Sequence, residues 1–115
     1  MCSVILDGQI VYSCMTPCWR GEGKKITTVE GLEAGGKLHP LQESFVKNFA
    51  SQCGYCTPAM LLSAKAIMDF DLNPTEEELL DALCGVLCRC TGYVSYLRAI
   101  KEALLQARNL KSGSQ

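Results

Sequence analysis

The sequence predicts an α+β fold in which a short β segment precedes an all-helical domain. Two patterns lead to this prediction. Before about residue 30, β-branched and apolar runs flank an Asp-Gly turn, which is typical of a hairpin. From residue 40 onward, apolar residues recur at helical spacing and are separated by Gly, Pro and two short cysteine-containing gaps. We therefore expect the cysteines of those gaps to lie in loops between helices.

Size and composition narrow the class of protein. The chain has 115 residues, enough for about one domain, with 48% hydrophobic and 20% charged residues. A formal net charge of -1 offers no electrostatic footprint for nucleic acid or an anionic membrane. No apolar run approaches the roughly 20 residues that span a bilayer, and the first residues lack the pattern of a secretory signal. We expect a soluble, cytoplasmic protein that is not inserted in a membrane.

The amino-terminal segment reads as β structure. Ser3–Leu6 and Gln9–Tyr12 flank Asp7 and Gly8, and Ile26–Val29 is a third β-branched run that could pair with them. Two or three such strands are marginally stable alone. We therefore expect this segment to depend on a neighbour.

The first predicted helix follows a Gly-rich linker. Pro40 suits a first helical position. Helical spacing places a set of apolar residues on one face of this helix: Leu41, Phe45, Val46, Phe49 and Ala50. After the first cysteine gap, a second helix is predicted with Thr57 as N-cap and Pro58 at the next position, and it continues through Met68.

The second half repeats this order. Thr75 and Glu78 form a predicted capping box for a third helix, which Gly85 ends. The fourth helix carries one apolar stripe: Tyr96, Leu97, Ile100, Ala103, Leu104 and Ala107. Each half thus reads helix, cysteine pair, helix, which predicts a four-helix domain with pseudo-twofold symmetry. The predicted boundaries are a β segment at 1–32, a linker at 33–39, the helical domain at 40–110 and a polar tail at 111–115.

Eight cysteines without an export signal favour metal ligation over a disulfide scaffold. Cys53 and Cys56 have a spacing that lets both thiols face one metal, and Cys88 and Cys90 flank a single residue. We expect the four thiols to converge on one point, which suits zinc or an iron–sulfur cluster. The short Cys88–Cys90 spacing favours [2Fe–2S], but spacing alone leaves zinc open.

The flanks of these cysteines carry a family resemblance. Gln52-Cys53-Gly54-Tyr55-Cys56-Thr57-Pro58 and Leu87-Cys88-Arg89-Cys90-Thr91-Gly92-Tyr93, in this order, resemble the iron–sulfur subunits of molybdenum hydroxylases, a group that includes xanthine dehydrogenase, aldehyde oxidoreductase and aerobic carbon monoxide dehydrogenase. Residues 30–45 resemble the domain junction of that family. The resemblance covers nearly the whole chain.

This resemblance implies a function and a set of site residues. The implied [2Fe–2S] ligands are Cys53, Cys56, Cys88 and Cys90, and Gln52 and Cys90 would lie against the pterin of a partner. The implied partners are a molybdopterin-binding large subunit and an FAD-binding medium subunit in a hetero-oligomer. This chain would then be an oxidoreductase subunit that transfers electrons and performs no substrate chemistry itself.

The amino-terminal segment resembles only part of the family's plant-type ferredoxin domain. Cys2 and Cys14 match its last two ligands, and the first two would precede Met1. The second cluster is therefore expected to be absent, completed by another chain, or lost with a truncated sequence. Cys18 matches no ligand position, and we expect Cys84 to be a small buried residue.

Two other interpretations remain open from the sequence. The first is a four-cysteine zinc module that serves structure or protein interaction. The second is a degenerate or truncated relative that keeps the helical fold without working in an enzyme. The sequence does not name a substrate, because the resemblance places substrate contacts on the partner.

Overall fold

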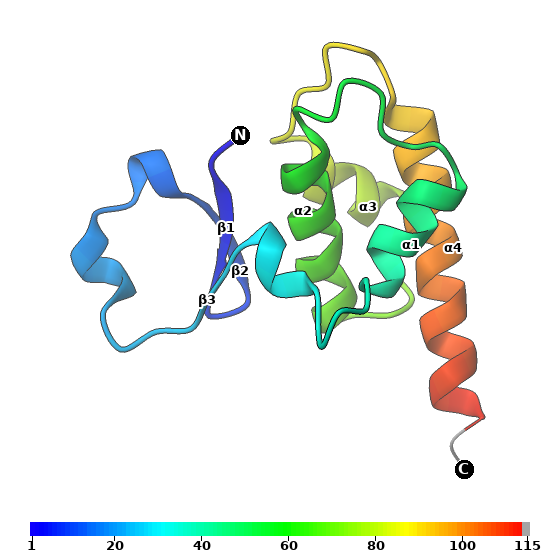
Figure 1. The fold of residues 1–115 in the computed structure, drawn as a ribbon, viewed down its shortest axis with the longest axis horizontal. Helices are drawn as coiled ribbons and strands as arrows, with labels where there is room; N and C mark the ends of the chain where they lie inside the picture. Colours follow the sequence, from blue (N-terminus) through cyan, green and yellow to red (C-terminus); the bar gives the residue numbers. More distant parts are fainter. Residues whose placement is uncertain (114–115) are drawn as a thin grey trace.

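The computed structural model describes residues 1–113 and confirms the α+β class. Within these residues, a three-stranded antiparallel sheet precedes four α-helices (Figure 1). The elements are β1 (Ser3–Leu6), β2 (Gln9–Tyr12), β3 (Ile26–Thr27), α1 (Pro40–Lys47), α2 (Thr57–Phe70), α3 (Glu76–Leu83) and α4 (Tyr93–Ser112). Helix α4 therefore continues into the predicted tail, whose residues 114–115 lie outside the described residues.

The sheet is built around the predicted Asp-Gly hairpin. Asp7 and Gly8 both take positive φ angles, 47° and 84°, as a two-residue type I′ turn requires. The strand order is β2-β1-β3, with both neighbours antiparallel to β1. The third strand is shorter than predicted, because Val29 begins a 3-10 helix, Val29–Leu32, instead of extending β3.

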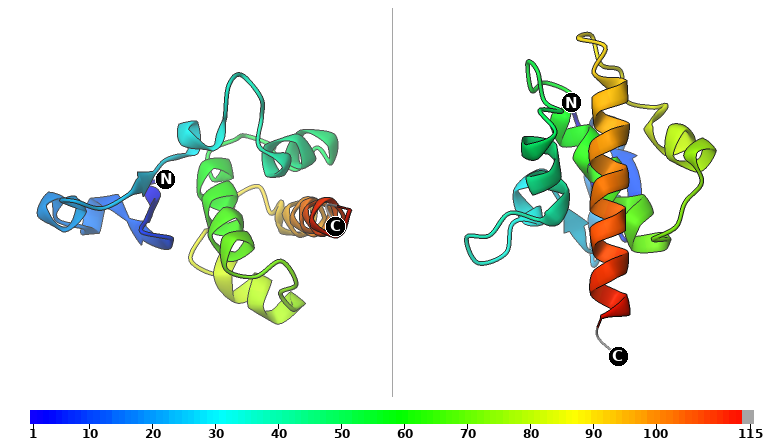
Figure 2. Two further views of the ribbon diagram at one scale, coloured as in Figure 1. Left: turned by 90° about the horizontal axis from the view of Figure 1, so that it is seen from below. Right: turned by 90° about the vertical axis from the view of Figure 1, so that its right-hand side faces the viewer.

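Helix α2 lies between the sheet and the other helices (Figure 2). Strands β1 and β2 contact α2 on one side, and α3, α1 and α4 contact it elsewhere. Ile5 of β1 belongs to the same buried cluster as Met60 of α2 and Ile100 of α4. The β segment, expected to be marginal alone, is thus stabilised by burial against the helical part.

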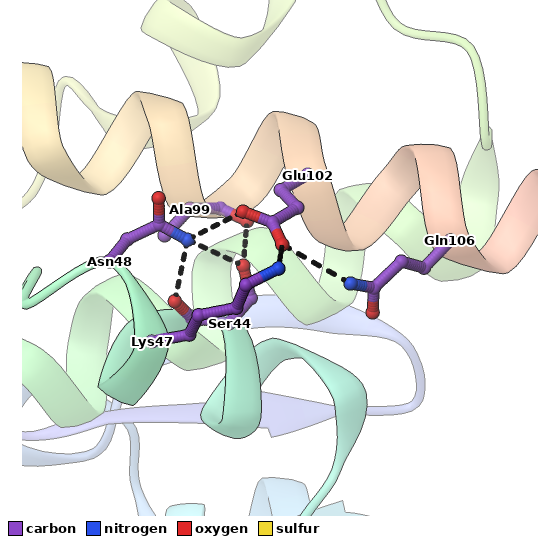
Figure 3. A network of polar contacts seen from close by, with 6 residues as sticks. All are labelled: Ser44, Lys47, Asn48, Ala99, Glu102 and Gln106. Atoms are coloured by element: carbon purple, nitrogen blue, oxygen red, sulfur yellow. Dashed lines mark hydrogen bonds and ion pairs between the residues drawn. The ribbon is translucent and has the colours of Figure 1, made fainter.

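Each short helix packs mainly on the long helix of the other half: α1 on α4 and α3 on α2. A polar network joins α1 to α4 (Figure 3). The buried Ser44 hydroxyl donates to the Ala99 carbonyl at 2.7 Å, and Asn48 Nδ2 donates to Glu102 Oε2 at 2.8 Å. Lys47 forms an ion pair with Glu102. The packing of each short helix on the long helix of the other half is compatible with pseudo-twofold symmetry, which stays a prediction.

The starts of the helices follow local capping chemistry. The predicted capping box of α3 is confirmed, because Glu78 N–H donates to Thr75 Oγ1 and Thr75 N–H donates to Glu78 Oε2. His39 caps α1 through Nδ1, which accepts from the Leu41 N–H at 3.2 Å. The predicted N-cap of α2 is wrong by one residue: Cys56 occupies the N-cap position, its side chain makes no capping hydrogen bond, and Thr57 begins the helix.

The predicted apolar face of α1 is wrong at its carboxyl end. Leu41 and Phe45 are buried, but Val46 is 69% exposed and Phe49 is 87% exposed. The helix ends at Lys47, and Phe49 takes a left-handed φ of 49°. Helical spacing therefore no longer applies at Phe49, whose side chain turns to solvent, while the Ala50 N–H closes the helix by donating to the Phe45 carbonyl at 2.9 Å.

Candidate metal centre

The two cysteine loops lie at the same end of the helical part. Residues 48–56, between α1 and α2, and residues 84–92, between α3 and α4, project beyond the same end of the helices in Figure 1. Positive φ angles at Gly54 (84°) and Thr91 (58°) turn each loop close to its cysteines. The predicted placement of the cysteines in interhelical loops is confirmed.

One cysteine from each loop forms an outer pair. The thiols of Cys53 and Cys90 interact with each other, and Cys53 is exposed while Cys90 is half-buried. A hydrogen bond from the Tyr55 backbone and the contact with Cys90 lower the pKa of Cys53. The Cys53 backbone lowers the pKa of Cys90, but the Cys53 thiol and burial outweigh it and raise that pKa overall.

The remaining two cysteines form an inner pair. Cys56 and Cys88 are buried, and their thiols also interact across the loops. Burial raises the pKa of Cys56, and a hydrogen bond with the Tyr96 hydroxyl opposes this shift. The Gly92 backbone N–H donates to Cys88 Sγ at 3.3 Å and is the main reason that the pKa of Cys88 is lowered. The inner pair therefore already has donors directed at its sulfur atoms.

The two pairs are not isolated from each other, because the Cys88 thiol also acts on the outer cysteines Cys53 and Cys90. No group of three or more His, Cys, Asp or Glu side chains within residues 1–113 is arranged around a single metal position. Among the four thiols, the hydrogen-bonding contacts join Cys53 with Cys90 and Cys56 with Cys88. A single tetrahedral zinc requires all four at one centre, whereas each iron of a [2Fe–2S] cluster takes two thiolates. The donor set therefore fits [2Fe–2S] better than zinc.

Two further residues hold the second loop in place. The Tyr93 hydroxyl accepts a hydrogen bond from the Cys88 backbone N–H at 2.7 Å. Tyr96 is 1% exposed, and its ring stacks on Phe45 with centroids 5.5 Å apart. The sequence interpretation treated Tyr96 as one apolar residue of a stripe. One signal in the sequence sets Tyr96 apart: it is the single tyrosine in a stripe of otherwise aliphatic residues. A buried tyrosine hydroxyl needs a hydrogen-bond partner, so its position indicates a polar contact in the core.

The structure also places the residues expected to face a partner. Gln52 is exposed next to the exposed Cys53, and Cys90 is half-buried. These residues therefore belong to the surface side of the centre. Cys84, expected to be buried, is exposed instead: it follows the last residue of α3 and lines an apolar groove with Leu80 and Leu83.

The amino-terminal cysteines form a separate pair. Cys2 Sγ and Cys14 Sγ lie 3.1 Å apart, because the Ser13 N–H donates to the Cys2 carbonyl and brings the two ends of the hairpin together. No third or fourth ligand joins them among the described residues. Two thiols do not supply the four ligands of a [2Fe–2S] cluster, so this pair does not by itself fit the group.

None of the helices in the described part of the chain combines the length and apolar character that crossing a bilayer requires.

Paired thiols from two loops at one end of a helical unit, with an α+β arrangement, are the features of a cysteine-ligated iron–sulfur protein. Comparison with known proteins specifies the family. Residues 28–101 match the family described as "[2Fe-2S] binding domain". The chain is 44% identical to the nicotine 6-hydroxylase small subunit of Paenarthrobacter nicotinovorans, over 94% of this chain and 65% of that protein. It is 42% identical to the nicotinate dehydrogenase small FeS subunit of Eubacterium barkeri, over 94% of this chain and 69% of that protein.

Two solved structures have the same fold as this chain and similar sequences. Quinoline 2-oxidoreductase from Pseudomonas putida 86 superposes with a TM-score of 0.85 at 42% identity, covering 92% of this chain and 66% of that one. Aldehyde oxidoreductase from Desulfovibrio gigas gives a TM-score of 0.87 at 39% identity, covering 94% of this chain and 12% of that one. The chain belongs to the [2Fe–2S]-binding family of molybdenum hydroxylase iron–sulfur subunits. It spans about two thirds of the length of the small subunits that it matches.

Proposed function

We propose that this chain is the electron-transfer subunit of a molybdenum hydroxylase and holds one [2Fe–2S] cluster on Cys53, Cys56, Cys88 and Cys90. The observation that carries the proposal is that the two cysteine loops lie at one end of the helical part, with Cys56 and Cys88 buried there beside the Tyr96 hydroxyl and the Gly92 N–H. Cys53 and Cys90 would hold one iron, and Cys56 and Cys88 the other. When bound, the cluster supplies a carrier that accepts and releases one electron.

The two pairs differ in their surroundings, which supports a direction for the electrons. Cys56 and Cys88 are buried, whereas Cys53 is exposed next to the exposed Gln52. We assign the surface formed by Gln52, Cys53 and Cys90 to the contact with the pterin cofactor of a partner large subunit. Burial of the inner pair excludes water from the side of the cluster that faces the helices.

The position of the amino-terminal segment supports a route by which electrons would leave the cluster. Met1 lines a cavity of about 210 Å³ together with Cys53, Cys56 and Leu87, so the amino-terminal segment lies against the cluster loops. Cys2 follows directly and pairs with Cys14. Electrons would leave toward an FAD-binding medium subunit past this segment, whether or not further ligands complete a second cluster there.

The chain itself would contact no substrate. Relatives of this chain are named for nicotine, nicotinate, quinoline and aldehydes. This variety supports a role in which substrate choice lies on the large subunit, and the small subunit contributes ligands, insulation and docking. We place the resulting hetero-oligomer in the cytoplasm.

The decisive experiment is an iron and acid-labile sulfide count with EPR on anaerobically purified chain. Two irons and two sulfides per chain are expected. Cys56→Ser and Cys88→Ser should lose the cluster, while the matched controls Cys84→Ser and Cys18→Ser, both at exposed positions, should keep it. Zinc without sulfide, or clusters that survive Cys56→Ser, would overturn the ligand assignment. Four irons per chain would show that Cys2 and Cys14 have found further ligands.

Assembly is tested separately by affinity purification from the native host. We expect a large subunit that contains molybdopterin and a medium subunit that contains FAD to purify with this chain. A cluster-containing chain that purifies alone under the same conditions would contradict the subunit role and leave the ligand assignment intact.

A further inference from the structure

Tyr96 places a hydroxyl group against the inner pair of thiols. Its oxygen lies 3.0 Å from Cys56 Sγ and 4.0 Å from Cys88 Sγ. The side chain comes from the first turn of α4 and is almost fully buried. Its ring is fixed on one side by stacking on Phe45 and on another by Gly92, where an added Cβ would lie 3.2 Å from the ring.

The direction of this hydrogen bond follows from ligation. With free thiols, either Cys56 or Tyr96 can donate. A cysteine that ligates iron has lost its proton, so only the Tyr96 hydroxyl is left to donate. A phenol that faces a buried thiolate and is shielded from water satisfies its single donor by pointing at the sulfur.

We propose that Tyr96 is a positioning residue for electron transfer: its hydroxyl donates to the cluster sulfur of Cys56 and raises the reduction potential of the cluster. This inference rests on the ligand set proposed above. Reduction adds one negative charge to the cluster and its thiolates. A donor directed at a ligating sulfur stabilises the reduced form more than the oxidised form, and hydrogen bonds to sulfur are among the factors that set such potentials.

The proposed donor is not equivalent to the others around the cluster. Gly92 and Tyr55 direct backbone N–H groups at Cys88 and Cys53, and these donors are retained whatever the side chains are. Tyr96 is the side-chain hydroxyl in contact with the inner pair, so a single substitution removes its contribution. Tyr96→Phe keeps the ring, its stacking on Phe45 and nearly all of its volume.

The test is a redox titration of the purified cluster-containing chain, followed by visible absorption and EPR. We expect Tyr96→Phe to bind the same iron and sulfide as the unmodified chain. Its equilibrium constant for one-electron reduction should fall about tenfold, which corresponds to a potential about 59 mV more negative. The matched control is Tyr12→Phe, which removes a hydroxyl bonded to the Gly85 carbonyl and not to sulfur, and its potential should be unchanged.

A second readout separates donation from a general packing effect. ENDOR spectra of the reduced cluster after exchange into D₂O should contain an exchangeable proton signal that Tyr96→Phe lacks and Tyr12→Phe keeps. An unchanged potential in Tyr96→Phe, or an unchanged set of exchangeable couplings, would overturn the inference. Absence of iron and sulfide from the unmodified chain would instead overturn the proposed ligand set, so the two failures are distinguishable.

Discussion

The Tyr12 hydroxyl donates a hydrogen bond of 3.1 Å to the Gly85 carbonyl, which joins the end of β2 to the turn after α3. An added Cβ at Gly85 would lie only 2.2 Å from this hydroxyl oxygen. The cysteine ligands of the second loop have other partners: the Cys88 backbone N–H donates to the Tyr93 hydroxyl, and its sulfur accepts from the Gly92 N–H.

This contact predicts a coupled effect of two substitutions. Gly85→Ala should displace Tyr12 and lower the free energy of unfolding by about 1 kcal/mol through loss of the hydrogen bond. Tyr12→Phe should cost a similar amount. In the double variant the costs should not add, because the clash and the bond involve the same oxygen. Chemical denaturation of all four proteins measures the coupling, and additive costs would contradict the contact.

We predict that the stability contributed by His39, the N-cap of α1, depends on pH. Burial, and secondarily the positive charge of Lys65, lower the pKa of His39 below its ordinary 6.5, while Asp69 opposes this shift. The unfolded chain therefore binds the proton more readily, so stability should fall as pH drops below 6.5. His39→Asn keeps an acceptor for the Leu41 N–H without titrating in this range. Unfolding free energies at several pH values should have a steeper slope in the unmodified chain than in His39→Asn.

We predict that the stability contributed by Glu102 changes in a more acidic pH range. Hydrogen bonds from Lys47 and then Asn48 lower the pKa of Glu102 below its ordinary 4.5. Its stabilising contribution is thus complete above pH 4.5 and is lost as pH falls through the lowered pKa. Glu102→Gln should unfold at a lower temperature than the unmodified chain near neutral pH, and the difference should shrink under acid conditions. A difference that is the same at every pH would exclude the charge as its source.

The backbone at Phe49 leads us to predict that glycine is preferred over alanine at this position. It is an exposed, non-glycine residue with a left-handed φ of 49° at the end of α1. Glycine adopts this conformation without steric cost. We expect Phe49→Gly to be more stable than the matched control Phe49→Ala by about 1 kcal/mol, because both lose the ring and only glycine removes the Cβ. Equal stabilities in thermal unfolding would show that the backbone is unstrained there.

Local signals in the sequence were sufficient for much of the fold. The Asp7-Gly8 turn and the Thr75–Glu78 capping box depend on chemistry within a few residues, and the structure has both. Helical periodicity failed where the helix stopped. Val46 and Phe49 fit the apolar face of an extended helix, but the chain leaves helical geometry after Lys47, and no nearby proline or glycine indicates this end.

The candidate centre was predictable in its residues and not in its geometry. The spacing and flanks of the cysteines indicate four ligands in two loops. The pairing of Cys53 with Cys90 and of Cys56 with Cys88 depends on how the halves of the helical part pack together, which no local pattern contains. The same holds for Tyr96, whose hydroxyl meets Cys56 only because α4 starts beside α2.

The pairing of thiols across the loops also bears on how the holoprotein matures. Each iron held as proposed would take one thiolate from each loop, so it would tie together segments that lie far apart in the sequence. The halves also pack on each other directly, α1 on α4 and α3 on α2, so the helical part has contacts between its halves that do not depend on a cluster. A bound cluster would then act as a cross-link between Cys53 and Cys90, which closes the chain segment between them and adds to the stability of the folded state.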